Sequence, residues 1–360
     1  MSTPDPLSKI PAPEAFDPTV QEQWPALRTD LLAWHAHQGR HHLPWKVSDP
    51  YAIWLSEIML QQTQVSTVLR YFEPWLKRFP TISALADAPE DAVMQSWEGL
   101  GYYSRARNLH KAAQHMRDRH AGAMPAARAD RLALPGIGPS TASAIGAFAF
   151  GQREAIFDGN VRRVWGRWMA DRLPEPLTHA QRDRWLWGFA QAVMPDSQRA
   201  ATWTQAVMDL GATVCTPRNP RCEVCPLALS CQARLMGEPE AFPPAAPRPK
   251  VENWDLHWVW VVHEGRLATV HRPAGGVWGR LWSLPEQAIP LGAIQAQGKH
   301  QLSHRKIRWD IHRADRLPDD PAIVWLDRES WEKQAWPQPL RRWWVGLSED
   351  ERSKWWADRG

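Results

Sequence analysis

The sequence predicts two domains, a mostly helical one over residues 21–235 and a smaller α+β one over residues 253–347. A chain of 360 residues is longer than one ordinary hydrophobic core requires. Apolar residues recur at helical spacing in the first part and form short β-type runs in the second. Five prolines between Gly237 and Lys250 exclude a regular helix or a central strand there. We therefore assign residues 236–252 to an extended, semi-rigid linker.

Both ends of the chain are predicted to be tails. Residues 1–20 are polar and rich in proline, and they lack the basic and apolar regions of a signal peptide, so we expect a flexible segment. Residues 348–360 read as a charged tail that is partly helical or frayed. No apolar run is long enough to cross a bilayer, which predicts a cytoplasmic protein without a membrane partner. A net charge of +4 permits nucleic-acid binding without requiring it.

The helical domain begins with a clear start signal. Asp49 and Pro50 are typical of an N-cap followed by proline at the first helical position, and a helix is predicted over 51–60. Glycine and proline separate the helices that follow. These are predicted over Asp91–Glu98, Ser104–His120, Ser140–Phe150, Val161–Met169 and Arg182–Met194.

The second domain is predicted from strand patterns. Residues 258–262 alternate tryptophan and valine and are followed by a His-Glu-Gly turn, and residues 267–271 return as a paired strand. Residues 307–312 and 323–326 are further strand candidates.

All four cysteines, Cys215, Cys222, Cys225 and Cys231, lie in one short loop. Such clustering indicates metal ligation, because a disulfide framework would spread its bridges along the chain. Four thiolates suit either tetrahedral zinc or a [4Fe–4S] cluster. Zinc ribbons usually carry two Cys-x-x-Cys knuckles and this loop has one, so the iron–sulfur interpretation is favoured over zinc and over unligated thiols.

A glycine hairpin precedes the predicted helix at Ser140. In the string Leu-Pro-Gly-Ile-Gly-Pro, Gly136 and Gly138 let the backbone approach a phosphate closely, and the next helix offers free N–H donors. Such a device positions a DNA duplex without reading its bases. The alternative is an ordinary turn between two helices.

Two acidic residues lie in distinctive strings, Glu57 in WLSEIMLQQTQV and Asp158 in FDGNVRR. With the hairpin, the cysteine loop and the string GLGYYSRARN from residue 99, they resemble the MutY family of adenine DNA glycosylases over about residues 25–235. The resemblance implies a helix-hairpin-helix glycosylase domain with a [4Fe–4S] cluster. It also implies a monomer that acts on double-stranded DNA with adenine opposite 8-oxoguanine or guanine. In the cell, the resemblance implies a bacterial protein that is associated with the nucleoid when it is bound to DNA.

The resemblance also implies roles for single residues. Glu57, in apolar surroundings that favour its neutral form, would protonate adenine at N7, and Asp158, at a helix N-terminus, would face the sugar cation. Ser140 stands where lyase relatives carry lysine, which implies a monofunctional enzyme. The remaining implied contacts are Asn160 beside Asp158, Trp45 in the pocket, Gln62, Thr63, Leu100 and Tyr102 beside the lesion base, Gln205 on the extruded adenine, and a monovalent cation on the carbonyls of Leu132, Leu134 and Ile137. Lys46 stands near an arginine of some relatives.

The second domain resembles the MutT-like domain of the same family, which is related to Nudix hydrolases. The strings GGVWGRLWSLPE from residue 275 and QLSH from residue 301 carry this likeness. The acidic Nudix helix is absent after Pro285, so the domain is expected to recognise DNA and not to hydrolyse pyrophosphate. Ser303 and His304 match the lesion-sensing loop, where Leu302 replaces a common phenylalanine.

Two other functions stay open at this point. One is an endonuclease III-like glycosylase with lyase action, and the other is a non-catalytic iron–sulfur protein that binds DNA. The histidine run His35, His37, His41 and His42 is interpreted as a solvated helix end, because no carboxylate or cysteine accompanies it in the sequence.

Overall fold

The computed structural model describes residues 5–245, 251–288, 293–302, 304–315 and 320–357. The chain forms two compact units. The first comprises Met1–Ala86 and Lys111–Ala246, and the second comprises Asp87–His110 and Pro247–Gly360. The helix α8 (Ser104–Arg119) begins in the second unit and ends in the first.

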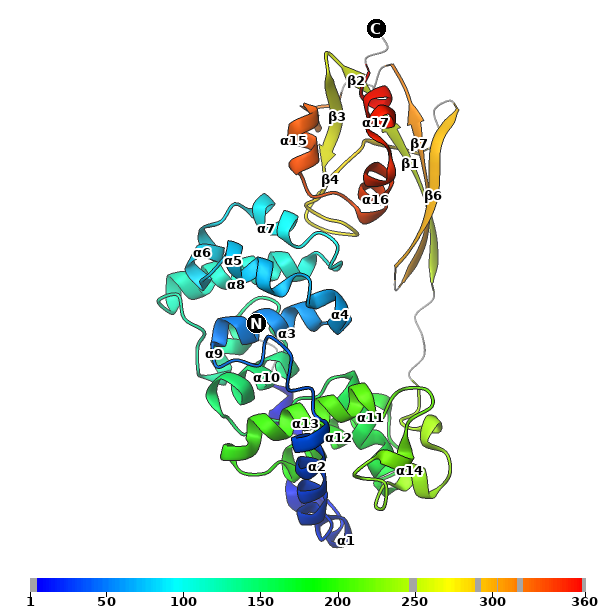
Figure 1. The fold of residues 1–360 in the computed structure, drawn as a ribbon. Coiled ribbons are helices and arrows are strands. Elements are labelled where there is room, and N and C mark those ends of the chain that lie inside the picture. Colours follow the sequence, from blue (N-terminus) through cyan, green and yellow to red (C-terminus); the bar gives the residue numbers. More distant parts are fainter. Residues whose placement is uncertain (1–4, 246–250, 289–292, 303, 316–319, 358–360) are drawn as a thin grey trace. The chain divides into compact units, whose positions relative to one another are not determined.

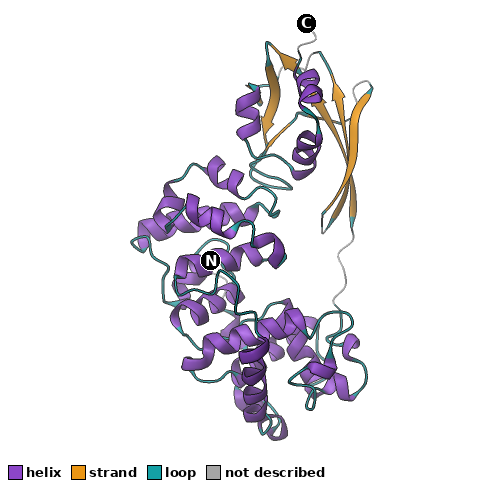
Figure 2. Ribbon diagram, in the orientation of Figure 1, coloured by secondary structure: helices purple, strands orange, loops and turns teal. Residues whose placement is uncertain are grey.

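The first unit is built from helices (Figures 1 and 2). Each helix predicted from the sequence is present, and no end differs from its predicted position by more than three residues. The helices are α1 (Pro18–Gln21), α2 (Trp24–Gln38), α3 (Pro50–Leu60), α4 (Val65–Val68), α5 (Phe72–Arg78), α6 (Ile82–Asp87), α9 (Arg128–Ala133), α10 (Pro139–Phe150), α11 (Gly159–Met169), α12 (His179–Val193), α13 (Ala200–Thr213) and α14 (Gln232–Leu235).

The N-terminal segment differs from the predicted tail. Residues 18–21 form α1, and the Phe16 ring is buried against the rings of Trp24, Trp185 and Phe189 at centroid distances of 5.5–6.3 Å. An aromatic side chain that contributes this much apolar contact orders the backbone around it. The polar composition of the segment gave no indication of this aromatic contact.

The second unit contains two four-stranded sheets. Its strands are β1 (Glu252–Trp260), β2 (Val262–His263), β3 (Arg266–His271), β4 (Trp282–Ser283), β5 (Glu286–Gln287), β6 (Ile294–Gln301), β7 (Arg305–Arg313) and β8 (Ile323–Leu326). One sheet has the order β5-β1-β7-β6, with β1 and β7 parallel, and in the other β3 pairs with β2, β4 and β8. Helices α7 (Glu90–Ser96), α15 (Arg328–Lys333), α16 (Gln338–Gly346) and α17 (Glu349–Trp356) complete the unit.

Tryptophan forms the core of this unit. Trp260 on β1 is fully buried, and its ring lies 5.3–5.9 Å from the rings of Trp331, Trp343, Trp344, Trp355 and Trp356. These five rings belong to α15, α16 and α17, and α16 and α17 lie between the two sheets (Figure 1). The high tryptophan content of the C-terminal region is therefore explained by packing, and the predicted charged tail contributes a helix to this core.

Residues 87–110 also depart from the predicted domain boundary, since they pack with the C-terminal strands and helices. Glu98 pairs with Arg341 at 3.3 Å, and the Gln95 side chain donates to the Lys333 carbonyl at 2.8 Å. Such contacts link distant parts of the chain and leave no mark on local sequence patterns.

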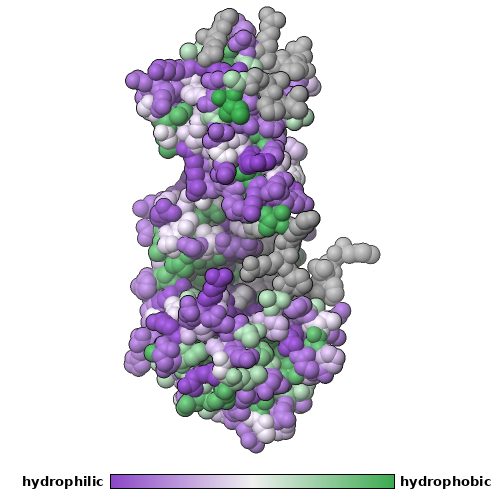
Figure 3. All heavy atoms as spheres, turned by 90° about the vertical axis from the view of Figure 1, so that its right-hand side faces the viewer, coloured by the Kyte–Doolittle hydropathy of each residue, from purple (hydrophilic) through white to green (hydrophobic). Residues whose placement is uncertain are grey.

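The surface turned to the viewer in Figure 3 is mostly hydrophilic. Within the described residues, no helix combines the length and the apolar character that crossing a membrane requires.

Candidate active site

Helix α3 places Glu57 on the wall of a cavity of about 760 Å³ in the first unit. The helix starts where the Asp49 carboxylate accepts the backbone N–H groups of Tyr51 and Ala52, at 3.1 and 3.2 Å. From there to Met59 every residue except Pro50 and Glu57 is buried. Burial raises the pKa of Glu57 to about 8, and the negative charge of Asp158 adds to this rise. Glu57 is therefore a carboxyl group that holds its proton at neutral pH.

Asp158 lines the same cavity from the start of α11. Its Oδ1 accepts the backbone N–H of Val161 at 2.7 Å, which makes it the N-cap of the helix. Burial raises the pKa of Asp158, although the N–H groups of Val161 and Asn160 and the charge of Arg163 act in the opposite direction. The helix N-terminus thus acts on Asp158 as expected, but burial outweighs it. Two carboxyl groups that are 101 residues apart in sequence face one cavity.

Most residues predicted to surround the substrate base line this cavity. Trp45, Thr63, Asn160 and Gln205 contribute to its wall. The buried Trp45 ring packs against Phe72 at 5.6 Å. Gln62 is exposed just after α3, with a left-handed backbone (φ 54°), and does not line the cavity.

The sequence interpretation missed Asp209, which organises one side of the cavity. Asp209 lies on α13 and is fully buried. Its carboxylate accepts the Arg40 backbone N–H and Nε, each at 2.8 Å, and the Gln205 side-chain N–H at 2.8 Å. Burial alone would raise the pKa of Asp209, but hydrogen bonds from His35 and Arg40 and the charge of Arg40 hold this pKa well below its usual range. The i, i+4 spacing of Gln205 and Asp209 on one helix face is the signal that could have revealed this pair.

The interpretation of the histidine run as a solvated helix end is wrong for His35. Its ring is 4% exposed, and its Nε2 lies 3.4 Å from Asp209 Oδ2. Asp209 is 174 positions from His35 in the sequence, and the fold brings its carboxylate beside the His35 ring. His37, His41 and His42 are exposed as expected. Lys46 also lines the cavity, with its Nζ 4.0 Å from Asp209 Oδ2.

Asn160 is held in place by Arg163 and Gly211. The Arg163 guanidinium donates to Asn160 Oδ1 at 2.9 Å, to the Gly211 carbonyl at 2.6 Å and to the Cys215 carbonyl at 2.7 Å. A side chain at Gly211 would come within 2.7 Å of Asn160 Cβ, so glycine allows α11 and α13 to approach closely. The cavity wall is thereby joined to the loop that carries the cysteines.

The predicted glycine hairpin connects α9 to α10. Gly136 has a left-handed backbone (φ 79°), which glycine adopts without strain, and both glycines are exposed. A Cβ at Gly138 would meet open space, so the surface is free for a ligand there. The fully buried Arg131 supports the hairpin by donating to the Ala142 carbonyl at 3.0 Å and to Glu154 at 2.9 Å. The Ser140 hydroxyl accepts the backbone N–H of Phe157 at 3.0 Å, directly before Asp158.

The four cysteines converge on one small pocket, which all of them line. Arg167, which is buried, donates to Cys215 Sγ at 3.3 Å and to the Thr216 carbonyl at 2.8 Å. A cationic donor beside a sulfur suits thiolate ligands, because it offsets their negative charge. The donor set therefore fits an iron–sulfur cluster bound by Cys215, Cys222, Cys225 and Cys231.

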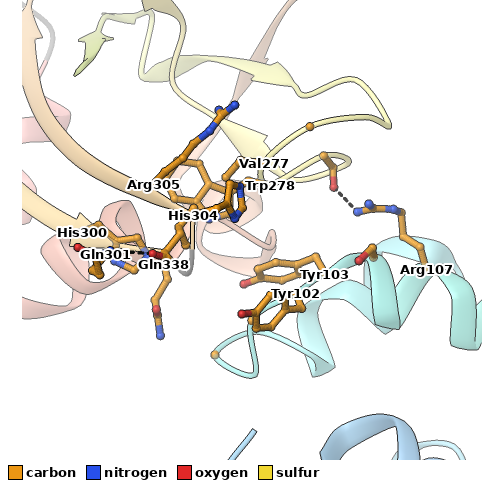
Figure 4. Close-up of a pocket in the computed structure, with 16 residues that line it drawn as sticks. Tyr102, Tyr103, Arg107, Val277, Trp278, His300, Gln301, His304, Arg305 and Gln338 are labelled. Carbon is orange, nitrogen blue, oxygen red and sulfur yellow. Dashed lines mark hydrogen bonds between the residues drawn. The ribbon is translucent and has the colours of Figure 1, made fainter. Parts of the chain in front are cut away.

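The second unit has a pocket of its own, of about 440 Å³ (Figure 4). Tyr102, 42% exposed, and Tyr103 lie on one side, and Trp278 and His304 lie opposite. Arg107 donates to the Gly279 carbonyl at 2.6 Å and joins the two sides. The pocket thus brings together two predicted lesion contacts, Tyr102 and His304, which are 202 positions apart in sequence.

Another predicted lesion contact, Leu100, is buried (5% exposed) and does not contribute to the wall of this pocket. Ser303 lies outside the described residues.

Two stretches of the sequence match known protein families. Residues 55–185 match the HhH-GPD superfamily of base excision DNA repair proteins, and residues 215–231 match the iron-sulfur binding domain of endonuclease III. Among solved structures, a thermostable thymine-DNA glycosylase aligns over 60% of this chain and 99% of its own, with TM-score 0.55 and 25% identity. A non-covalent endonuclease III-DNA complex shares the fold with TM-score 0.50 and 20% identity, over 59% of this chain and 97% of its own. The protein is a DNA glycosylase that binds an iron–sulfur cluster.

Similar proteins of known function indicate which kind of DNA glycosylase this is. The chain is 35% identical to the adenine DNA glycosylase of Buchnera aphidicola subsp. Baizongia pistaciae, over 76% of this chain and 82% of that protein. It is 43% identical to human adenine DNA glycosylase, over 88% of this chain and 61% of that protein. The Mycobacterium tuberculosis adenine DNA glycosylase is 39% identical, over 60% and 70% respectively. The chain belongs to the adenine DNA glycosylase family.

Proposed function

We propose that this chain hydrolyses the N-glycosidic bond of adenine mispaired with 8-oxoguanine or guanine in double-stranded DNA, acting as a monomer. The observation that carries the proposal is the pair Glu57 and Asp158 on one cavity, with Glu57 protonated at neutral pH. Extruding adenine from the duplex brings its base into reach of both groups.

Glu57 is the general acid in this mechanism. Adenine is a poor leaving group, and a proton on N7 withdraws electrons from the breaking bond to the sugar. A carboxyl group with a pKa of about 8 carries that proton under physiological conditions, whereas an ordinary glutamate is ionised there. After the bond breaks, Glu57 is an anion and can take a proton from the attacking water.

Asp158 faces the sugar in this mechanism. Loss of the base leaves an oxocarbenium ion, and a carboxylate beside it stabilises the developing positive charge. The N–H groups of Val161 and Asn160 favour the ionised form of Asp158 that this role requires. Asn160, fixed by Arg163, supports the same end of the cavity.

Gln205 recognises the extruded adenine. Because its N–H group donates to Asp209, its carbonyl oxygen is the atom left to accept a hydrogen bond from the exocyclic amine. Trp45 forms an apolar wall for the flat base. Gln62 and Thr63 are proposed to fill the gap that the extruded base leaves in the duplex. The burial of Leu100 argues against a direct contact of its side chain with DNA.

Tyr102, Ser303 and His304 are proposed to read the oxidised guanine in the opposite strand. An aromatic ring and an imidazole in one pocket supply a stacking surface and a hydrogen-bonding group. The exposed hairpin glycines, Gly136 and Gly138, approach the DNA phosphates. A monovalent cation on the carbonyls of Leu132, Leu134 and Ile137 would add positive charge to this hairpin, and the cluster in the cysteine loop is proposed to be [4Fe–4S].

One assay separates this function from its alternatives. The protein is incubated with duplexes that carry adenine opposite 8-oxoguanine, adenine opposite guanine, or thymine glycol, and strand breaks are compared with and without alkali. Alkali-dependent cleavage of the adenine strand alone is the expected result. Alkali-independent nicking or action on thymine glycol indicates an endonuclease III-like lyase, and binding without cleavage indicates a non-catalytic protein.

The lesion-reading pocket has its own test. His304→Ala should reduce the preference for adenine opposite 8-oxoguanine over adenine opposite guanine, and the exposed His263→Ala should leave this preference intact. Unchanged discrimination in the His304 variant would remove this residue from lesion recognition.

A further inference from the structure

Three metal-ligating side chains meet on the sheet of the second unit, outside both pockets described above. His257 lies on β1, and Asp310 and His312 lie on β7. Because β1 and β7 are parallel and His257 pairs with Asp310, these three side chains share one face of the sheet. One donor atom from each lies within 4.8 Å of the other two, the only such group among the described residues.

Both imidazoles point at the same carboxylate. His257 Nδ1 lies 2.9 and 3.0 Å from the two oxygens of Asp310, and His312 Nε2 lies 2.7 Å from Oδ1. His312 is fully buried, while the His257 and Asp310 side chains are 19% and 16% exposed. His257 and Asp310 also line a shallow hollow, so an ion can reach the group from the surface.

The charge of Asp310 is otherwise unbalanced. Nearby Arg308 pairs with Asp255 at 2.7 Å, and within the described part of the chain no arginine or lysine forms an ion pair with Asp310. Lys299 and Arg308 belong to the rim of the same hollow. A carboxylate withdrawn from water is stabilised by hydrogen-bond donors or by a bound cation. Two neutral imidazoles with one carboxylate are a ligand set that zinc and related divalent metals prefer.

We propose that His257, Asp310 and His312 bind a divalent transition-metal ion that clamps β1 to β7. Three protein ligands leave a further position for water, which the hollow supplies. A tetrahedral zinc ion holds its ligand atoms about 3.4 Å apart, so each imidazole nitrogen must withdraw from the Asp310 carboxylate by roughly half an ångström.

The test uses the full chain with its iron–sulfur cluster, without a polyhistidine tag, and zinc as the probe. Zinc and iron per chain are measured after gel filtration, and X-ray absorption at the zinc edge reports the ligands. We expect one zinc ion per chain in addition to the iron, with nitrogen and oxygen at about 2.0–2.1 Å and no sulfur at about 2.3 Å. Zinc should raise the unfolding temperature of the second unit, because it binds the folded state only.

Matched variants decide the assignment. His257→Ala and the isosteric Asp310→Asn should each weaken zinc binding more than about tenfold, whereas His263→Ala on strand β2 of the other sheet should bind like the parent chain. An unchanged near-ultraviolet circular dichroism spectrum, which includes the buried tryptophans of the second unit, confirms that this unit has folded in each variant. Absence of bound zinc in the parent chain, sulfur among its ligands, or equal binding by His257→Ala and His263→Ala would each overturn the proposal.

Discussion

At the scale of single residues, the pKa of Glu57 makes a prediction about both catalysis and stability. Its value of about 8 means that the folded protein holds this proton more tightly than the unfolded chain does. The stability gained from that proton is complete below about pH 4, and it is lost progressively as the pH rises to about 8. Glu57 loses the proton that it needs for catalysis as the pH approaches and passes about 8.

Glu57→Gln should therefore abolish adenine excision while mispaired DNA is still bound, and it should stabilise the protein. We expect a gain of about 1–3 kcal/mol at pH 8 and almost none at pH 4, because glutamine cannot ionise. Single-turnover excision by the parent chain should fall as the pH rises through about 8. Denaturant unfolding at several pH values and gel-shift binding measure these effects. A variant that loses DNA binding, or that shows no pH-dependent gain, would contradict the role of Glu57.

Ser140 determines the chemistry that follows base loss. Its hydroxyl accepts the Phe157 N–H and offers no amine that could attack the sugar. The parent chain should form no efficient borohydride-trapped adduct with DNA, and Ser140→Lys should form one. Ser197→Lys, exposed elsewhere in the same unit, serves as the control and should form none. Efficient trapping by the parent chain would show that the enzyme is not monofunctional.

At the scale of secondary-structure elements, Asp209 joins α13 to the loop after α2. It is fully buried and has a pKa well below its usual range, so its stabilising effect is present at neutral pH and is lost as the pH falls through the acid range. Asp209→Asn leaves the Arg40 charge without its partner and releases the Gln205 amide. We expect a loss on the order of 3 kcal/mol at pH 7, which shrinks below about pH 4, together with a higher KM for mispaired DNA.

The matched control for Asp209 is Asp196→Asn. Asp196 is an exposed carboxylate that pairs with Arg199 at 3.1 Å, and its replacement should leave the free energy of unfolding almost unchanged. Equal effects of the two substitutions in denaturant unfolding would show that the buried network contributes no more than a surface pair.

Local sequence patterns predicted the elements whose signals are local. The N-cap at Asp49, the glycine hairpin and the strand pair around Gly265 all appear where the sequence indicated them. Helix α13 was missed because most of its residues are buried, so its sequence does not show one apolar face opposite a polar one. Strand β6 was missed because an edge strand of glutamine, lysine and histidine shows no alternation of apolar residues. The environments of His35 and Asp209 depend on contacts across the chain, which no local pattern reports.

At the scale of the whole molecule, the chain divides its tasks between two compact units with different cores. The first unit contains the cavity with Glu57 and Asp158 and the cysteine loop, and the second contains the pocket with Tyr102 and His304. The iron–sulfur cluster reports on the first unit, whereas buried tryptophans lie in both units, among them Trp54 and Trp165 in the first and Trp260 and Trp331 in the second. A near-ultraviolet transition that moves while the cluster absorbance stays in place therefore reports on the second unit.

Trp260→Ala should unfold the second unit selectively. The substitution removes a fully buried ring that contacts five other tryptophans and donates to the Trp355 carbonyl at 2.8 Å. Such losses usually amount to about 3–5 kcal/mol, which lowers the melting temperature of a unit of this size by roughly 10 °C. The near-ultraviolet circular dichroism transition should move, while the transition seen in the cluster absorbance stays in place. Trp325→Ala, 38% exposed on β8, should move neither transition, and a joint shift of both signals in Trp260→Ala would show that the two units unfold as one.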